Sequence, residues 1–310
     1  MASSNHTKTT VTYKNVGDLP ICADVYISKT TSVSEAGRPV VFYMHGGAFI
    51  RGDRETFGPA LIEQITNRGW MLISIDHRLA PEVKFSEIWS DCEDAWKWLH
   101  QEGPKQFGPL DLSRVAVFGA SAGGMLALIA GYRFSPKPKV IVDYYGCADI
   151  TKKLGSYGAS KELSDEEIRE LYSERVLTGV PITAKDGKMY SDERRSLLLS
   201  SIVQKGIWAE HVLGFDPSED SNSQLLAPWL PEKHITSDFP PTFVLHGTKD
   251  SIVPFTQSLR LVEVLKKNNV IHEFLVAEGK DHVYDYYMDA EHPEFNALLA
   301  PTYQFLDKYL

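Results

Sequence analysis

The chain has 310 residues, of which 43% are hydrophobic and 24% are charged, so it is long enough to bury a sizeable core. Its formal net charge of −9 and its pI near 5.6 argue against nucleic acid or an anionic membrane as a partner, because both bind concentrated positive charge. The apolar runs are short and the N-terminus lacks a signal-peptide pattern, so we expect a cytoplasmic protein.

The first thirty residues predict a β-hairpin. Residues 9–13 and 21–27 alternate between apolar and polar side chains, and turn-forming residues 15–18 separate them. After the hairpin, short runs of consecutive apolar residues alternate with longer amphipathic segments. Strands are predicted at residues 40–44, 71–75, 115–118, 140–145, 242–245 and 274–277, and helices at residues 59–68, 87–100, 122–132, 256–268 and 293–310. This alternation predicts an α/β fold with a mostly parallel, doubly wound sheet.

One stretch, residues 148–237, breaks the alternation. It carries charge-rich helical segments, such as residues 161–176, and no clear buried strand. We interpret it as a helical cap inserted over the carboxyl ends of the strands, between core segments 1–147 and 238–310. The alternative is a surface excursion unrelated to function.

Residues 119–124, GASAGG, follow the strand predicted at 115–118 and begin a predicted helix. A G-x-S-x-G pattern at such a junction is typical of a nucleophile elbow, where a sharp turn raises the serine above the sheet. Gly119 and Gly123 have a steric reason to be glycine, because strand and helix pass closely there. Ser121 is therefore the predicted nucleophile, and the N–H of Ala122, at the free helix end, is a predicted oxyanion donor.

A second candidate element is the sequence HGGAF at residues 45–49, directly after the strand predicted at 40–44. A glycine pair after a strand lets backbone N–H groups point into an open site, as stabilisation of a tetrahedral oxyanion requires. Gly46, Gly47 and Ala48 are therefore predicted to form an oxyanion hole. The alternative is an ordinary strand-to-loop turn.

Asp250 and His282 are the predicted partners of Ser121, because each lies in a loop after a predicted strand. Of the ten histidines, only His282 lies in a loop after the last predicted strand and downstream of a suitable acid, since His292 directly precedes Pro293 at a predicted helix start. His45 and His246 begin loops beside glycine and are interpreted as structural. The competing acids, Asp281 and Asp285, are close neighbours of the histidine in sequence, and such neighbours rarely reach its inner ring nitrogen.

Residues 76–82, DHRLAPE, follow the strand predicted at 71–75. We interpret them as an internal cluster of ion pairs and hydrogen bonds that braces the neighbouring oxyanion loop. The alternative is surface charge at a turn.

Taken together, these segments resemble the hormone-sensitive-lipase-like branch of the α/β-hydrolase esterases. That branch carries HGGG, DYRLAPE, GDSAGG, D-x-x-x-P and G-x-x-H in this order, and the present chain reads HGGA, DHRLAPE, GASAGG, DSIVP and GKDH. The order serine, acid, histidine also matches. The resemblance implies an α/β-hydrolase fold with a capped sheet, esterase chemistry and no cofactor, and it maps the family's oxyanion donors onto Gly47, Ala48 and Ala122, with Gly46 adjacent. Three residues depart from the pattern and leave the substrate open: Ala48 for glycine, His77 for tyrosine and Ala120 for aspartate.

The sequence thus predicts a serine hydrolase that cleaves small to medium carboxylic esters through an acyl-enzyme. Tyr157 and Trp208 are candidates for lining the substrate pocket, or else they form the core of the cap. A lactonase or an arylformamidase would use the same residues, an acyltransferase would need a site that favours another alcohol over water, and a non-catalytic small-molecule receptor is disfavoured because His282 is present. The expected partner is a small ester or lactone, with no nucleic acid and no membrane, and a homodimer is left open. Neither a metal nor a disulfide is expected, since no H-E-x-x-H spacing occurs and the cysteines, Cys22, Cys92 and Cys147, are odd in number.

Overall fold

The computed structural model of the chain describes residues 5–31, 35–155, 163–173 and 193–310. In these residues one sheet of eight strands runs in the order β1-β2-β4-β3-β5-β6-β7-β8. The strands are β1 (His6–Val16), β2 (Leu19–Ser28), β3 (Arg38–Met44), β4 (Met71–Ile75), β5 (Leu110–Ala120), β6 (Val140–Tyr144), β7 (Thr242–Gly247) and β8 (His272–Ala277). The pairs from β4 through β8 are parallel, which confirms the predicted sheet class.

The predicted hairpin is confirmed. Strands β1 and β2 pair antiparallel, with Val16 opposite Leu19 across a turn in which Gly17 has a φ of 59°. Strand β2 then pairs antiparallel with β4, so the hairpin extends one edge of the parallel sheet.

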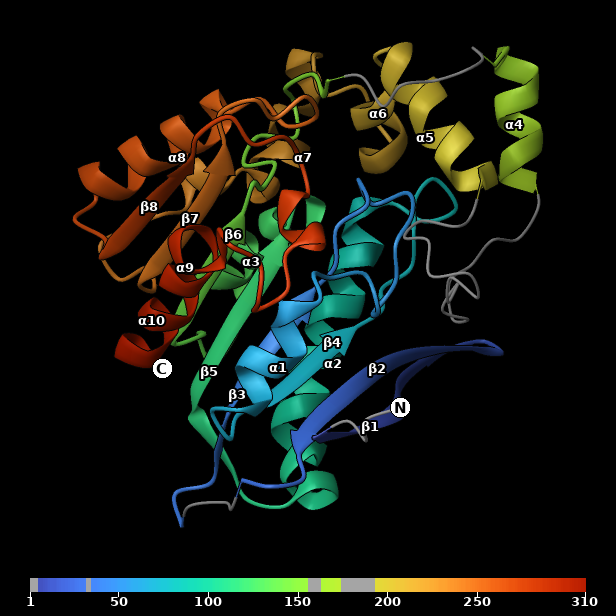
Figure 1. Cartoon of the computed structure of the whole chain (residues 1–310). Helices are drawn as coiled ribbons and strands as arrows, with labels where there is room; N and C mark the ends of the chain where they lie inside the picture. The colour runs from blue at the N-terminus through green and yellow to red at the C-terminus, as the bar shows by residue number, and fades with distance from the viewer. Residues whose placement is uncertain (1–4, 32–34, 156–162, 174–192) are drawn as a thin grey trace.

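Helices cover both faces of the sheet (Figure 1). In β3, Val40, Phe42 and Met44 face one core and Val41 and Tyr43 face the other, because successive side chains of a strand point to opposite sides. The first core is completed by α2 (Phe85–Phe107), α3 (Ala122–Arg133) and α8 (Thr256–Lys267), and the second by α1 (Ala60–Thr66), α9 (Phe295–Leu298) and α10 (Ala300–Tyr309). None of the described helices is both long and apolar enough to cross a membrane.

Two of the predicted helices depart clearly from the structure. Helix α2 continues past His100 through Pro104 to Phe107, where the Phe107 ring packs edge-on against Trp98. The single helix predicted at 293–310 is instead two, α9 and α10, and Pro301 lies in the first turn of α10, a position where proline needs no N–H partner.

Between β6 and β7, the described residues of 148–237 form helices and no strand. The helices are α4 (Asp165–Ser173), α5 (Glu193–Gln204), α6 (Trp208–Leu213) and α7 (Ser223–Leu226), with short 3₁₀ turns at Asp220–Asn222, Ala227–Trp229 and Pro231–Lys233. Figure 1 shows α4, α5 and α6 beyond the carboxyl ends of the strands. We refer to residues 148–237 as the cap, and its limits as a domain stay a prediction.

Candidate active site

Ser121 lies on the turn between β5 and α3. Its φ of 57° and ψ of −120° are a strained conformation that non-glycine residues rarely adopt. A Cβ atom on Gly119 would lie 1.9 Å from the carbonyl oxygen of Gly123, and one on Gly123 would lie 2.0 Å from that of Met44. The turn is therefore possible only with glycine at both positions, as the G-x-S-x-G pattern requires.

The structure brings Ser121, His282 and Asp250 into one chain of contacts. The Ser121 Oγ atom lies 3.0 Å from His282 Nε2, and His282 Nδ1 lies 2.7 Å from Asp250 Oδ2. A carboxylate can only accept, so Nδ1 carries the proton and Nε2 accepts from the serine hydroxyl. This is the geometry in which a histidine can take a proton from a serine.

Asp250 is held as a carboxylate. Burial favours its neutral form, but hydrogen bonds from His246 and His282 outweigh this and lower the pKa of Asp250 below its ordinary value. Its second oxygen, Oδ1, accepts from the backbone N–H of Ile252 at 2.9 Å and of Val253 at 2.8 Å. Four donors thus fix both the charge and the orientation of this side chain.

His246 contacts the same carboxylate and was not anticipated as part of the site. Its Nε2 atom lies 3.1 Å from Asp250 Oδ2 and 3.0 Å from the Val253 carbonyl oxygen, both acceptors, so Nε2 carries the proton. Its Nδ1 atom lies 2.6 Å from the Ser258 hydroxyl, which donates to it. His246 lies near the end of β7 and Asp250 in the loop that follows, and no sequence pattern indicated that the two side chains meet.

The two competing acids have other partners. One oxygen of Asp281 accepts from the N–H and hydroxyl of Ser251 and from the backbone N–H of His282. This carboxylate therefore stabilises the backbone around His282 and is not the partner of the imidazole ring. Asp285 accepts from the Tyr145 hydroxyl at 2.5 Å, and the Tyr145 ring packs edge-on against the His282 ring at 4.7 Å. Tyr145 is a second contact of the histidine that the sequence did not indicate.

The glycine loop, which we define as residues 45–49, passes directly against the nucleophile. Met44, which precedes it, is paired with Gly119, and a Cβ atom on Gly46 would lie 3.2 Å from the Ser121 Cβ. Among the described residues, none accepts a hydrogen bond from the backbone N–H of Gly47, Ala48 or Ala122. Their part in an oxyanion hole, and that of Gly46, stays a prediction.

Residues 76–82, which follow β4 and which we call the brace, contact this loop, as the sequence predicted. Residues 76–80 are buried and Pro81 and Glu82 are partly buried, so the segment is not a charged surface turn. Arg54, beyond the glycine loop, donates to both oxygens of Asp76, from its backbone N–H at 2.8 Å and from its guanidinium at 2.5 Å. The N–H of Ala80 donates to the Phe49 carbonyl at 2.8 Å. The glycine loop is thus bound to the residues after β4 at Phe49, and the chain beyond the loop is bound to them at Arg54.

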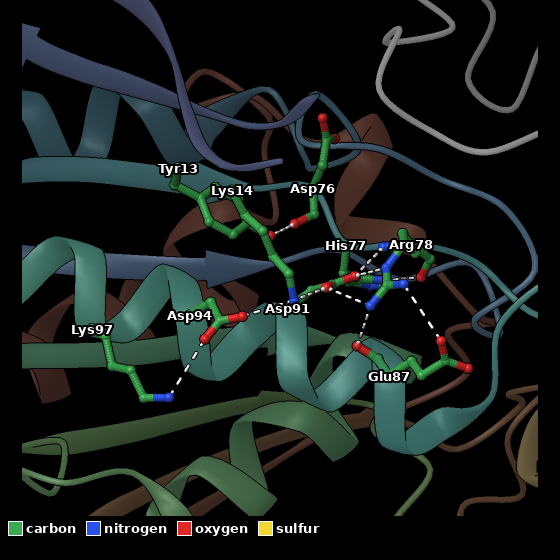
Figure 2. Close-up of polar contacts among 9 residues, drawn as sticks. All are labelled: Tyr13, Lys14, Asp76, His77, Arg78, Glu87, Asp91, Asp94 and Lys97. Atoms are coloured by element: carbon green, nitrogen blue, oxygen red, sulfur yellow. Dashed lines mark hydrogen bonds and ion pairs between the residues drawn. The ribbon is translucent and has the colours of Figure 1, made fainter. Parts of the chain in front are cut away.

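A second part of the brace anchors the same turn to α2. Figure 2 shows Arg78 and Lys14 converging on Asp91, with Arg78 Nε 2.8 Å and Lys14 Nζ 2.7 Å from its oxygens. Tyr13 donates to the Asp76 carbonyl at 2.6 Å from the hairpin side. Asp91 is fully buried, so these cations supply the partners that a buried carboxylate needs.

Of the two predicted pocket residues, Tyr157 lies outside the described residues. Trp208, at the start of α6, is buried, and its indole N–H donates to the Ala48 carbonyl at 2.9 Å. Its contact is with the glycine loop, and a role in binding substrate stays a prediction. No cluster of histidine, cysteine or acidic side chains suited to a metal ion occurs in the described ranges, and the three cysteines are buried and unpaired.

Comparison with known proteins gives the family. A family model described as the alpha/beta hydrolase fold matches residues 41–286. The chain belongs to the α/β-hydrolase family. This family includes the hormone-sensitive-lipase-like esterases, so the resemblance of the five motifs is confirmed. A solved structure of the hyperthermophilic esterase from Pyrobaculum calidifontis superposes on this α/β-hydrolase with a TM-score of 0.68 and 22% identity, covering 98% of this chain and 86% of that one, which shows the shared fold.

Two curated relatives of this α/β-hydrolase are much longer proteins. It is 30% identical over 333 aligned residues to the non-reducing polyketide synthase pkbA of Emericella nidulans, covering 91% of this chain and 13% of the synthase. It is 28% identical to the non-reducing polyketide synthase Preu6 of Preussia isomera, covering 98% of this chain and 15% of that protein. The chain therefore spans about one seventh of their length.

Proposed function

We propose that this protein is a serine hydrolase that cleaves small to medium carboxylic esters through an acyl-enzyme. The observation that carries the proposal is the chain of contacts from Ser121 Oγ to His282 Nε2 at 3.0 Å and from His282 Nδ1 to Asp250 Oδ2 at 2.7 Å. A hydroxyl, a base and a carboxylate in this order make the serine nucleophilic.

In the first half of the reaction, Ser121 Oγ attacks the ester carbonyl carbon while its proton passes to His282 Nε2. Asp250 stabilises the imidazolium that forms, and the N–H groups of Gly47, Ala48 and Ala122 bind the oxyanion. When the tetrahedral intermediate collapses, the carbon–oxygen bond to the alcohol breaks and the alcohol leaves with the proton from His282.

In the second half, water attacks the acyl group on Ser121 and gives a proton to His282. Collapse of the second tetrahedral intermediate releases the carboxylic acid, and the proton returns to Ser121 Oγ. No cofactor or metal takes part in this scheme. Helix α6 contacts the glycine loop and α5 contacts the residues that brace it. From this position the cap would cover the bound substrate.

A thioester of a polyketide acyl group is a second candidate substrate. The observation that favours it is the match of 91% of this chain to a segment of a non-reducing polyketide synthase. A thioester uses the same nucleophile and the same oxyanion donors, and its thiol is a better leaving group than an alcohol. Lactones and aryl formamides would also be cleaved by this machinery and belong in the same comparison.

Three unpaired, buried cysteines support a reducing compartment, so we infer a cytoplasmic enzyme that acts on a small molecule. A measurement of the protein's mass in solution tests whether it forms a homodimer.

The experiment that tests the proposal is a hydrolysis panel on the purified protein. It compares p-nitrophenyl esters of graded acyl length, lactones, aryl formamides and N-acetylcysteamine thioesters of aromatic acids. A fluorophosphonate probe, followed by peptide mapping, should label Ser121. If the probe labelled another residue, or if the protein hydrolysed the substrates without being labelled at all, Ser121 would not be the nucleophile.

A further inference from the structure

The glycine loop contains three consecutive residues in the left-handed region of the backbone map. Gly47 has a φ of 115°, Ala48 of 55° and Phe49 of 63°. For a residue with a Cβ atom this conformation costs roughly 1–2 kcal/mol. Ala48 and Phe49 therefore keep it only because neighbouring contacts hold them there.

Each of the three carbonyl oxygens of these residues has a donor. The Gly47 oxygen accepts from the N–H groups of Ile50 and Arg51 within the same turn, and the Phe49 oxygen accepts from Ala80 in the brace. The Ala48 oxygen accepts from the indole N–H of Trp208 at 2.9 Å. Two of the three anchors thus belong to the core, and the third comes from the cap.

The Trp208 contact opposes one specific motion. Rotation of the peptide unit between Ala48 and Phe49 would change the φ of Phe49 and release it from the left-handed region, but the Ala48 carbonyl would then turn away from the indole. The Trp208 ring also stacks on Phe49, with centroids 6.3 Å apart, while Phe49 packs edge-on against Phe85 at 5.0 Å. The indole therefore holds both the carbonyl and the side chain that this rotation would move.

Two residues of α5 also join the cap to the same region. The Arg51 guanidinium donates to the Ser196 hydroxyl of α5 at 2.8 Å. Arg195 of α5 donates to the Ala80 carbonyl at 3.1 Å and pairs with Glu82 at 2.8 Å, and its guanidinium is almost completely buried. The cap is thus attached at the glycine loop, at the turn after it and at the residue that anchors Phe49.

We propose that Trp208 is a positioning residue for the oxyanion hole: by holding the Ala48 carbonyl and the Phe49 ring, it keeps Ala48 and Phe49 in the left-handed conformation and so preserves the loop backbone that carries the N–H of Ala48. This inference rests on the proposed function, in which that N–H binds the oxyanion. It gives the cap a part in the chemical step, beyond covering the substrate.

The decisive variant is Trp208→Phe, which keeps an aromatic ring beside Phe49 and removes the N–H. We expect kcat to fall about tenfold for every acyl length, below the roughly 10²–10³ lost when an oxyanion donor is removed outright. KM should stay within about twofold, because a positioning contact acts in the transition state more than in the substrate complex. Binding of a trifluoromethyl ketone, which becomes an oxyanion on addition to Ser121, should weaken by the same factor as kcat.

Trp229→Phe is the matched control. Trp229 also lies in the cap and packs edge-on against Phe85 at 5.0 Å, but it makes no hydrogen bond to the glycine loop among the described residues. It should leave kcat and inhibitor binding unchanged. If Trp208→Phe does not fold, benzothienylalanine at position 208 retains the shape of the indole without its N–H and should give the same tenfold loss.

Three results would overturn the inference. The first is an unchanged kcat. The second is a loss of activity that depends on acyl length, which would mean that Trp208 lines the substrate pocket. The third is a lower kcat with unchanged binding of the trifluoromethyl ketone. These are separable from failure of the proposed function, because in that case the Ser121→Ala variant, assayed alongside, would keep its activity.

Discussion

His45 and His77 lie face to face at the base of the glycine loop, with ring centroids 4.2 Å apart and planes inclined by 12°. Both rings are buried, and the Nδ1 atom of each lies against a backbone carbonyl, that of Gly46 at 2.7 Å and that of Arg78 at 2.8 Å. Burial lowers the pKa of both histidines, and repulsion from His77 lowers that of His45 further. The stack is therefore stable with both rings uncharged, and His77 is where the family pattern has tyrosine.

This stack predicts a loss of stability in acid. Below the ordinary histidine pKa of 6.5 the unfolded chain takes up protons at both residues while the folded protein does not, so the free energy of unfolding falls as pH drops. Each pH unit below 6.5 costs up to about 1.4 kcal/mol per histidine until the lowered pKa is reached. Urea unfolding at pH values on either side of 6.5 measures the slope. The variant His77→Tyr should have a shallower slope than the wild type, and equal slopes would contradict this account.

Ser121→Ala is expected to abolish hydrolysis without unfolding the protein. Loss of a triad nucleophile costs on the order of 10⁶ in kcat, and alanine removes only a hydroxyl from this turn. Steady-state rates and the thermal midpoint of the purified variant test both parts. Ser201→Ala is a suitable control, because that serine is also buried but donates to the Leu197 carbonyl within α5. A Ser121→Ala variant with even a tenth of the wild-type rate would exclude Ser121 as the nucleophile.

His246→Leu tests the second histidine on Asp250. The variant removes the donor at 3.1 Å from Asp250 Oδ2 and leaves Ser258 without the Nδ1 acceptor. We expect the free energy of unfolding to fall by about 1–3 kcal/mol, because buried polar groups lose their partners, and kcat to fall as the carboxylate loses orientation. Ser258→Ala, which removes only the outer contact, should cost less in both quantities. Denaturant unfolding and kcat, measured for both variants, test this order. Larger losses in Ser258→Ala than in His246→Leu would show that His246 does not act through Asp250.

Much of the core could be read from local sequence, because its strands are buried on both faces. Strand β4 has the predicted limits, 71–75, since all five of its residues are buried. Strand β5 begins at Leu110, ahead of the predicted 115. The apolar pattern missed this first part because its residues are mostly only partly buried and include charged side chains. Helix α2 passes through Gly103 and Pro104, residues that usually end helices, and packing of Phe107 on Trp98 outweighs that preference.

In the candidate site, too, some residues carry a local sequence signature, whereas other contacts do not. Ser121, Asp250 and His282 follow strand ends and carry local signatures, so their approach was predictable from chain order. The Trp208 contact with Ala48 joins residues 160 positions apart, and no local pattern indicates it. His246 has a signature, a glycine after a strand, but that pattern reports a turn and not the partner of the side chain. Contacts that orient the reacting groups therefore required the folded structure.

The surface of the cap predicts how the enzyme responds to an oil–water interface. The residues Asp165, Glu166, Arg169 and Glu170 are exposed on α4, so this helix presents charge to solvent. Large exposed hydrophobic residues of the described chain are Leu225, Leu259, Ile271, Val276 and Tyr287, and of these only Leu225 belongs to the cap. Enzymes that bind a lipid surface use a contiguous apolar patch, which these residues do not form in the cap.

We therefore expect no gain in rate when the substrate forms droplets. The measurement is the initial rate against the concentration of a short-chain triacylglycerol, taken from well below to well above its solubility limit. A smooth saturation curve through the limit, with the same kcat as in the soluble range, is the expected result. A stepwise increase at the limit would mean that the cap opens an apolar surface at the interface, and the enzyme would then act as a lipase. A fully soluble p-nitrophenyl ester, assayed in the presence of the same droplets, separates such activation from a simple change in substrate supply, because only an enzyme activated at the interface would cleave it faster.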